Sequence, residues 1–349
     1  MKYRHAAASI YSPISIAPMM DKTHRHFRWF LRQLSRQVLL YTEMITPTAI
    51  IHGNRDHILD FDPVERPLVL QLGGDNPDEM TEAIRIAEDW DYDEYNLNVG
   101  CPSDRVQQRN FGACLMADPE RVARVLEVMY RAGSRPVSIK HRIGIEGQNI
   151  SLGTYDDMST FVKRLKDGPA RRYIIHARVA ILEGLSPKEN RHIPPLRYEE
   201  VYRLKEEYPY LHIEINGGIR NCEEIDEHLK NCDGVMLGRI AYERPWQLTG
   251  LDRRYYGELT NGYTNELCAP SRRQIIEAWF GYLLRQAEEG VNVRSLVWPV
   301  LELFAGERGS RKWKQSLSRS IPAGMKAEEF LAESFEAAPK EFLDEKEEI

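Results

Sequence analysis

Short apolar runs, each followed by a segment of helical periodicity, limit most strongly what this chain can fold into. Eight such runs occur, at residues 14–17, 39–43, 68–71, 95–98, 137–141, 173–176, 213–216 and 234–237. Each has the length and the apolar character of a buried strand. Segments 78–90 and 119–131, which follow two of the runs, repeat apolar residues every three or four positions, as amphipathic helices do. Eight β/α units in sequence predict an α/β fold, the closed (β/α)8 or TIM barrel.

The alternation stops after residue 248, and four helical segments follow at 271–289, 293–304, 310–317 and 327–335. Ser271 is a suitable N-cap for the first of them. We therefore expect a barrel domain at 1–251, a linker at 252–270, an all-helical C-terminal domain at 271–336 and an acidic tail at 337–349. The tail is rich in charge and poor in apolar residues, so we expect it to be disordered.

The net charge of −6 is unevenly distributed along the chain. Residues 328–349 hold nine acidic and two basic side chains, whereas residues 271–326 hold ten basic and five acidic ones. The chain without its acidic end carries a net charge of +1. A basic helical domain followed by an acidic tail suits an anionic partner such as nucleic acid.

Cysteine usage and hydropathy indicate the cellular compartment in which we expect this protein. The five cysteines form no Cys-x-x-Cys pair and no zinc-like cluster, so we expect free thiols, a reducing compartment and no metal. No apolar run approaches the length of a membrane span, and the first residues are too polar for a secretory signal. We expect a cytoplasmic monomer that does not bind membranes.

Polar residues or glycines stand at the C-terminal end of nearly every run, where a β/α barrel carries its chemistry. They are Ala17-Pro18-Met19, Glu43, Gln71, Asn98 with Cys101, Lys140 with Arg142, His176 with Arg178, Asn216-Gly217-Gly218, and Gly238-Arg239. Core-facing residues of a strand are normally aliphatic, so these polar ends predict a pocket. The last two groups fall where barrels commonly bind phosphate. A phosphate at the rim of a reactive centre suits flavin mononucleotide (FMN).

The stretch Asn96-Leu-Asn-Val-Gly-Cys-Pro-Ser103 breaks the fourth run abruptly. Gly100 frees the backbone before Cys101, and Pro102 removes a donor after it. A free cysteine is more often a small buried hydrophobe than a reagent. At this junction of strand and loop, however, the pattern predicts a functional thiol. With an ordinary pKa of about 8.5, a thiol is protonated at neutral pH and can act as a general acid.

This stretch, followed by Phe111-Gly-Ala-Cys-Leu-Met116, resembles the signature of the A-type tRNA-dihydrouridine synthases, and the resemblance runs from about residue 14 to about residue 317. It implies reduction of the C5–C6 double bond of uridine in the D-loop of tRNA, at positions 20 and 20a. The electrons would come from FMN reduced by NADPH, with hydride passing from flavin N5 to C6 and a proton from Cys101 to C5. The family's flavin contacts correspond to Ala17, Pro18, Met19, Gln71, Lys140, His176, Asn216, Gly217, Gly218, Gly238 and Arg239.

Charge and hydrogen bonding agree with two of these assignments. A reduced flavin carries negative charge near N1 and the C2 carbonyl, and Lys140 is a suitable cation for it. His176 suits a neutral donor to the same edge, and it equally suits a satisfied core histidine.

Binding of tRNA is the second implication of the resemblance. The loop 184–196 matches an A-type hallmark and presents Lys188 and Arg191, which we expect to contact RNA phosphates although charged loops are usually only solvated. Asn98 is expected to reach the base or the flavin edge. The helical domain adds five basic side chains around Trp313, which either stacks on RNA or belongs to the core: Arg308, Arg311, Lys312, Lys314 and Arg319. The chain departs from the A-type pattern at Trp298-Pro299, usually Arg-His, and at Val179, often Lys.

Two other functions fit parts of the sequence. An FMN-dependent barrel oxidoreductase of a free pyrimidine, similar to dihydroorotate dehydrogenase, would not need the basic helical domain. A non-catalytic RNA-binding barrel would not need Cys101 or Lys140. A Gly-x-Gly-x-x-Gly fingerprint is absent, so NADPH is expected to visit the flavin only transiently.

Overall fold

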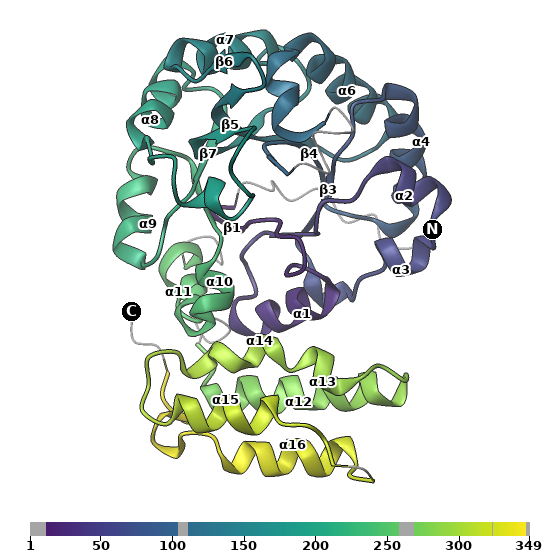
Figure 1. Ribbon diagram of the computed structural model, residues 1–349, viewed down its shortest axis with the longest axis vertical. Helices are drawn as coiled ribbons and strands as arrows, with labels where there is room; N and C mark the ends of the chain where they lie inside the picture. Colours follow the sequence, from purple (N-terminus) through teal and green to yellow (C-terminus); the bar gives the residue numbers. More distant parts are fainter. Residues whose placement is uncertain (1–11, 104–110, 258–268, 323, 347–349) are drawn as a thin grey trace. The chain divides into compact units, whose positions relative to one another are not determined.

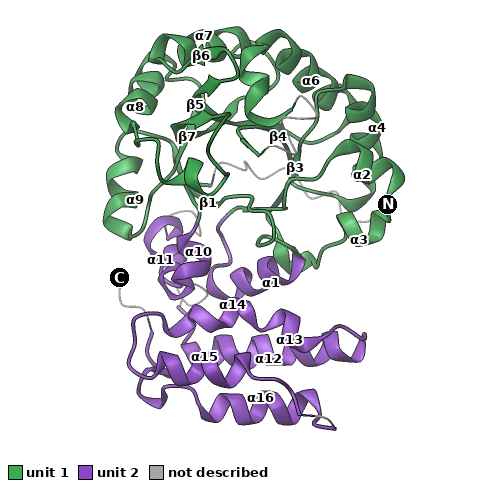
Figure 2. Ribbon diagram, viewed as in Figure 1, with its two compact units in different colours: residues 1–24, 39–238 green, residues 25–38, 239–349 purple. Residues whose placement is uncertain are grey.

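The computed structural model describes residues 12–103, 111–257, 269–322 and 324–346. The chain divides into two compact units (Figure 2). The barrel unit comprises residues 1–24 and 39–238, and the helical unit comprises residues 25–38 and 239–349.

Eight parallel strands form the barrel unit (Figure 1). They are β1 (Ile14–Ile16), β2 (Leu40–Tyr41), β3 (Leu68–Leu72), β4 (Glu94–Val99), β5 (Val137–Gly147), β7 (Arg172–Ile181), β8 (His212–Asn216) and β9 (Gly234–Leu237). Their order in the sheet is β1-β9-β8-β7-β5-β4-β3-β2. A parallel bridge between Ser15 and Leu39 joins the two ends, and the Ile16 N–H donates to the Leu39 carbonyl at 2.8 Å. The predicted TIM barrel is therefore confirmed.

Helices surround the strands, as the periodicity predicted (Figure 1). The main ones are α4 (Pro77–Ala87), α6 (Pro119–Ala132), α7 (Tyr155–Leu165), α8 (Tyr198–Glu207) and α9 (Cys222–Leu229), and the shorter α2 (Pro47–His52) and α3 (Arg55–Leu59) follow β2. Asn76 and Asp118 cap α4 and α6 with their side-chain oxygens, and a proline begins each helix, where its missing N–H costs nothing.

A short hairpin in the barrel unit was not predicted. Strand β5 runs past the expected end at residue 141 and pairs antiparallel with β6 (Ile150–Leu152). The connecting residues Gln148 and Asn149 both have positive φ, 54° and 62°. Gln-Asn lacks the glycine that normally signals such a turn, so no local pattern predicted it.

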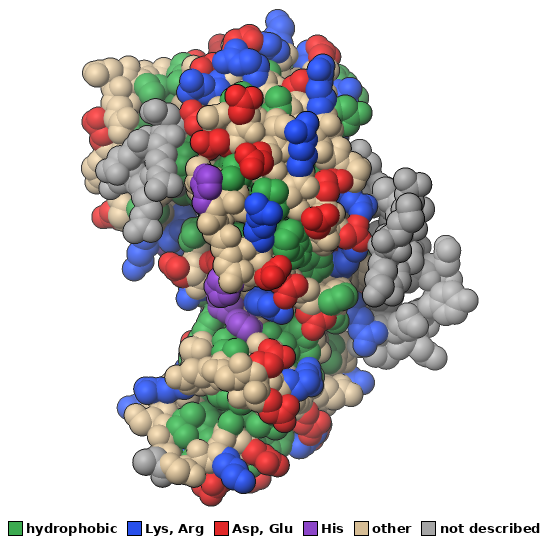
Figure 3. Space-filling view, turned by 90° about the vertical axis from the view of Figure 1, so that its right-hand side faces the viewer, with side chains coloured by type: hydrophobic (Ala, Val, Ile, Leu, Met, Phe, Trp, Pro, Cys, Tyr) green, Lys and Arg blue, Asp and Glu red, His purple; other side chains and the backbone are tan. Residues whose placement is uncertain are grey.

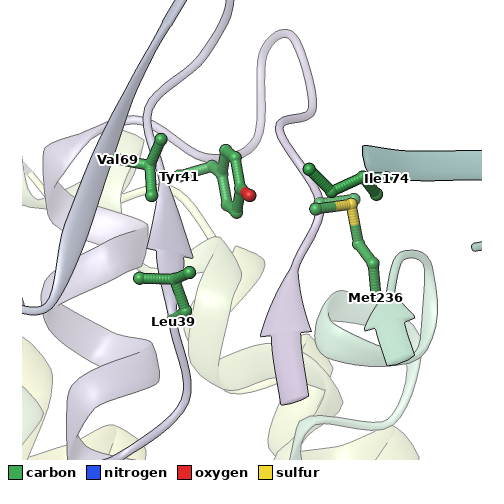
Figure 4. Packing of buried hydrophobic residues seen from close by; sticks show 6 residues of the cluster. Leu39, Tyr41, Val69, Ile174 and Met236 are labelled. Atoms are coloured by element: carbon green, nitrogen blue, oxygen red, sulfur yellow. The ribbon is translucent and has the colours of Figure 1, made fainter. Parts of the chain in front are cut away.

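The interior of the barrel is packed from several strands. One cluster of buried side chains consists of Ala17, Leu39, Tyr41, Val69, Ile174 and Met236, and Met19 packs against it. Figure 4 shows this cluster, whose residues come from segments at both ends of the barrel sequence. The interior is therefore a filled core, and chemistry is confined to the ends of the strands.

The helical unit contains α1 (Arg25–Leu34), α10 (Ile240–Glu243), α11 (Leu251–Tyr256), α12 (Arg272–Glu288), α13 (Val293–Leu296), α14 (Trp298–Leu301), α15 (Ser310–Ser318) and α16 (Ala327–Glu336). Ser271 caps α12, with its hydroxyl accepting from the Gln274 N–H, as predicted. The single helix expected at 293–304 is instead three short turns, because Pro299 lacks the N–H that a continuous helix would need there.

The units divide the chain differently from the predicted boundary at residue 251. Helix α1 belongs to the helical unit because its aromatic face packs there: Trp29 stacks on Tyr282 with ring centroids 4.3 Å apart, and Phe27 lies 4.7 Å from Trp298. The expected linker at 252–270 begins inside α11, and its residues 258–268 lie outside the described residues.

The expectation of a disordered tail at 337–349 is wrong for residues up to 346. Leu343 is fully buried, and its carbonyl accepts a hydrogen bond of 2.8 Å from the Arg273 N–H at the start of α12. Asp344 pairs with the Arg273 side chain at 2.7 Å, and Glu345 pairs with Arg272 at 3.2 Å. Two arginines at the start of α12 thus pair with acidic residues of the tail, and the net charge of the tail alone does not predict these ion pairs. Residues 347–349 lie outside the described residues.

Among the residues that the structure describes, none of the helices has the length and the apolar character needed to span a membrane.

Candidate active site at the carboxyl end of the barrel

Asn98 shapes the turn that carries Cys101. Its Oδ1 accepts hydrogen bonds from the backbone N–H groups of Gly100 and Cys101, at 3.1 and 3.0 Å. The Cys101 side chain is half-buried, and its thiol lies 3.6 Å from Ser103 Oγ. The strand therefore ends in a tight turn that holds the thiol over the carboxyl end of β4, as the sequence predicted.

Lys140 lies beside this turn. The register of β4 and β5 places it opposite Asn98, and its Nζ donates to Asn216 Oδ1 at 3.2 Å. Burial, and after it the charge of the neighbouring Arg142, lowers the pKa of Lys140 to about 8, although Cys101 acts in the opposite direction. Lys140 is thus a cation at neutral pH that lies within electrostatic range of the thiol.

Arg142 connects the site to two loops. It is 3% exposed; its Nε donates to the Gly100 carbonyl at 3.0 Å, and one Nη donates to the carbonyls of Val179 and Asn190 at 3.3 and 3.2 Å. Burial lowers its pKa to about 10. Sequence analysis located Arg142 at the end of a predicted strand but could not predict its role. Its backbone partners lie on segments that are far apart in the chain.

His176 stands among cations. Burial lowers its pKa well below the ordinary value, and the charges of Arg142, Lys140, Arg178 and Arg191 lower it further. His176 is therefore neutral at pH 7. The four cations around it make this end of the barrel positive, which favours an anionic ligand.

Gly217 and Gly218 fill positions that need glycine. Their φ angles are +122° and +80°. A Cβ on Gly217 would lie 2.6 Å from His176 Cδ2, and one on Gly218 would lie 2.6 Å from a Leu196 methyl carbon. The backbone at Gly217 thus lies so close to His176 that a side chain on residue 217 would not fit.

The neighbouring loops meet the same edge. Asn216 Nδ2 donates to the carbonyl of Met236, its register partner, at 2.8 Å, so the loops after β8 and β9 begin side by side, the second of them at Gly238. Arg239 comes next in sequence and opens the segment that belongs to the helical unit. Its part in a phosphate site stays a prediction.

The remaining predicted cofactor contacts lie at or near the carboxyl ends of β1 and β3. Ala17 is buried at the end of β1, and Pro18 and Met19 are partly buried after it. The Met19 N–H donates to Thr23 Oγ1 at 2.9 Å, which fixes this loop. Gln71 is only 1% exposed, and its amide bonds to Asn98 and Asn96. The predicted residues of the barrel unit therefore share one end of the barrel, and their contacts with a cofactor stay predictions.

The loop 184–196 is anchored to β7. Asn190 is fully buried, and its side chain bonds both the N–H and the carbonyl of Ile181, at 2.8 and 2.9 Å. Arg178 donates to the carbonyls of His192 and Pro194. Lys188 and Arg191 are exposed on this fixed loop. Sequence analysis did not identify Asn190 and Arg178 as anchors of this loop, because no local sequence pattern predicts these partners.

In the helical unit, the open question about Trp313 is answered. Its side chain is fully buried, its Nε1 donates to the Val300 carbonyl at 3.0 Å, and its ring meets Phe304 edge-on. Trp313 is therefore a core residue. Of the basic residues around it, Lys314 pairs with Glu302 and Arg319 pairs with Glu333, whereas three others are exposed and have no ion pair within the described residues: Arg308, Arg311 and Lys312.

Comparison with known proteins agrees with this geometry. Residues 15–342 match the sequence model of the dihydrouridine synthase (Dus) family. The tRNA-dihydrouridine(20/20a) synthase of Synechocystis is 49% identical over 331 residues, which cover 95% of this chain and 96% of that protein. The protein of the same name from Pseudomonas aeruginosa is 46% identical over 317 residues, covering 91% and 92%.

Among solved structures, a complex of 2-naphthoyl-CoA reductase with 2-naphthoyl-CoA aligns with a TM-score of 0.52 and 10% identity. The alignment covers 69% of this chain and 50% of that one, and it shows a shared fold alone. The family match spans almost the whole chain and includes the Cys101 turn, Lys140 and the paired glycines. This chain belongs to the dihydrouridine synthase family.

Proposed function

We propose that this protein is a tRNA-dihydrouridine synthase. It would reduce the C5–C6 double bond of uridine in the D-loop of tRNA, at positions 20 and 20a, with FMN as bound cofactor and NADPH as reductant. The observation that carries the proposal is the Cys101 thiol held by Asn98 beside Lys140 at the end of the barrel. Its support is the family membership and the likeness to two relatives named tRNA-dihydrouridine(20/20a) synthase.

The residues present fit FMN. Gly217 keeps the backbone open beside His176, where any Cβ would clash. Lys140 would hold the negative charge that a reduced flavin carries, and neutral His176 would donate a hydrogen bond. When bound, FMN supplies the hydride that adds to C6 of the uracil ring. We assign the remaining contacts to Ala17, Pro18, Met19, Gln71, Asn216, Gly218, Gly238 and Arg239.

Cys101 completes the reduction by protonating C5. The S–H bond of Cys101 breaks as the C5–H bond forms. Lys140 and Arg142 stabilise the thiolate that remains, since both lie within electrostatic range of Cys101. The half-buried thiol can then recover a proton from water.

The uridine must leave its stack to reach this site, which requires phosphate contacts around the pocket. Asn98 uses one N–H for Gln71 and keeps the other for a base carbonyl. On the face shown in Figure 3, basic and acidic side chains are interspersed, so no single broad basic surface is visible there. We assign phosphate contacts to particular exposed side chains, Lys188 and Arg191 on the anchored loop and Arg308, Arg311 and Lys312 in the helical unit.

Mapping dihydrouridine by mass spectrometry in unmodified tRNA treated with the purified protein and NADPH tests the proposal. We expect the modification at positions 20 and 20a. Cys101→Ala should keep its flavin and lose turnover by on the order of a hundredfold or more. Cys114→Ala is the matched control, because this second thiol donates to the Phe111 carbonyl and burial raises its pKa.

Three outcomes would count against parts of the proposal. Full turnover by Cys101→Ala would remove the thiol as the acid. Reduction of free uracil or orotate, without modification of tRNA, would favour the small-pyrimidine oxidoreductase. Purified protein without a flavin spectrum would remove the cofactor assignment.

A further inference from the structure

Five buried polar side chains connect the Cys101 turn with the opposite end of the barrel. In order they are Asn98, Gln71, Asn96, Ser138 and Glu94, and each is at most 8% exposed. Asn98 Nδ2 donates to Gln71 Oε1 at 2.9 Å, Gln71 Nε2 donates to Asn96 Oδ1 at 2.8 Å, and Asn96 Nδ2 donates to Ser138 Oγ at 2.7 Å. The Ser138 hydroxyl then donates to Glu94 Oε1. We call these five residues the relay.

At the Glu94 end of the relay, the chemistry of the groups determines which one donates and which one accepts in each hydrogen bond. Glu94 Oε1 also accepts a hydrogen bond of 3.0 Å from Arg172, and a guanidinium can only donate. As a carboxylate paired with this guanidinium, Glu94 accepts at both contacts, so Ser138 gives it the hydroxyl hydrogen. The Ser138 lone pairs then face Asn96, so Asn96 must present its NH2 group there and its carbonyl oxygen to Gln71.

The direction is fixed equally at the upper end. The backbone N–H groups of Gly100 and Cys101 can only donate, and both point at Asn98 Oδ1. Asn98 must therefore turn its NH2 group to Gln71, which is the orientation that the lower end also requires. The two ends agree, and each amide between them has a single orientation that satisfies both of its neighbours.

The lower end is itself held firmly. Arg172 is 3% exposed and lies between Glu94 and Glu214, donating to Glu214 at 2.8 Å and also to the Tyr41 hydroxyl. Ser15 Oγ donates to Glu214 Oε2 at 2.9 Å. These contacts fix Glu94 at the floor of the barrel, on the opposite end from the pocket.

We propose that Ser138, Asn96 and Glu94 are positioning residues, which orient the Asn98 amide through Gln71 and thereby hold the Cys101 thiol where it protonates the base. The inference rests on the proposed function, because it assigns these residues to the step in which Cys101 is the acid. All three side chains are at most 3% exposed. If Asn98 reversed its amide, its NH2 group would face two N–H groups, and the turn that carries Cys101 would open.

Ser138→Ala tests the inference, because it removes the group that accepts from Asn96 and donates to Glu94. Ser15→Ala is the matched control: it deletes an equally buried hydroxyl bonded to the other carboxylate of the same arginine, outside the relay. Ser138→Thr keeps the hydroxyl and should restore the wild-type values. Ser138→Cys keeps the volume but is a weak donor and acceptor, so it replaces Ser138→Ala if that variant does not fold.

Two quantities are measured on the flavin-loaded protein. One is turnover on tRNA, and the other is the rate at which iodoacetamide alkylates Cys101 between pH 6 and 9, read by peptide mass spectrometry. In Ser138→Ala we expect kcat to fall on the order of tenfold, since a slightly misplaced acid costs that much or more, with KM for tRNA unchanged. We expect the pH-independent rate of thiolate alkylation to rise about threefold or more as the turn opens.

Equal values in Ser138→Ala and Ser15→Ala for both quantities would overturn the inference. The alkylation rate reports the position of the thiol whether or not Cys101 is the acid. Failure of the proposed function, seen as full turnover by Cys101→Ala, is therefore distinguishable from failure of the relay.

Discussion

Arg142 Nε donates a hydrogen bond of 3.0 Å to the carbonyl of Gly100, the residue that precedes Cys101. The same guanidinium donates to the Asn190 carbonyl at 3.2 Å, so one side chain joins the Cys101 turn to the loop 184–196. The position of the proposed acid and that of the proposed RNA-binding loop therefore depend on a common buried cation.

Arg142→Lys should show this dependence. A lysine keeps the charge but cannot reproduce the planar fork that reaches three carbonyls. We expect kcat/KM on tRNA to fall at least about tenfold, and the free energy of unfolding to fall by about 1.5–3 kcal/mol for a lost charged hydrogen bond. Turnover and urea unfolding measure the two effects. Arg121→Lys, at a half-exposed surface pair with Asp75, should change neither, and an equally silent Arg142→Lys would show that the carbonyl contacts are dispensable.

The lowered pKa of Lys140 predicts a pH dependence for the flavin. Since that pKa is about 8, Lys140 carries its full charge only below this pH and loses it as the pH rises. A cation stabilises an anionic reduced flavin, so Lys140→Met should lower the flavin midpoint potential at pH 7 by on the order of 30 mV, equivalent to about 1.4 kcal/mol for two electrons. The difference from wild type should be constant below pH 8 and shrink above it.

Spectroelectrochemical titration between pH 6.5 and 9.5 measures this difference. His176→Gln is the control, because the pKa of His176 lies well below its ordinary value and its charge does not change over this range. Any offset in His176→Gln should therefore be independent of pH. A Lys140→Met offset that did not shrink above pH 8 would contradict the role of the Lys140 charge.

Gly217→Ala should disturb the site through geometry alone. The φ of +122° is unfavourable for alanine, and the new Cβ would lie 2.6 Å from His176 Cδ2. We expect the free energy of unfolding to fall by about 1–3 kcal/mol and flavin to be lost on dialysis. In Gly238→Ala a Cβ would meet nothing within 4 Å, so this variant should unfold like the wild type. Equal unfolding in the two variants would refute the steric argument.

Much of the barrel could be predicted from the sequence, because its strands are short apolar runs whose ends carry polar residues. Cys101, Lys140 and Gly217 were found in this way, since each lies within a few residues of the end of a predicted strand. Ser138 and Glu94 were not, because they lie within strands and a buried polar residue there indicates a partner without naming it. The partners of Ser138 come from β4 and those of Glu94 come from β5 and β7, and only the register of the sheet brings them together.

The helical unit was harder to predict, because its contacts join distant segments. Helix α1 packs on α12 through Trp29 and Tyr282, and nothing local to residues 25–38 indicates that partner. The same holds for the acidic end. Charge alone suggests that deleting residues after 336 would favour RNA binding, but the deletion would also remove the fully buried Leu343 and the partners of Arg272 and Arg273.

Three exposed cations of the helical unit, Arg308, Arg311 and Lys312, provide a test of RNA binding. Replacing Arg308, Arg311 and Lys312 together by glutamine should weaken tRNA affinity and flatten its dependence on salt. Each lost phosphate contact removes just under one unit from the slope of log K against log salt, so the slope should fall by about 2–3 units. Lys314→Gln is the control, since Lys314 already pairs with Glu302 at 2.5 Å and should leave the slope unchanged. Filter binding at several salt concentrations measures the slopes. If the triple variant kept the wild-type slope, these cations would be an ordinary solvated face, and phosphate binding would rest on Lys188, Arg191 and the barrel rim.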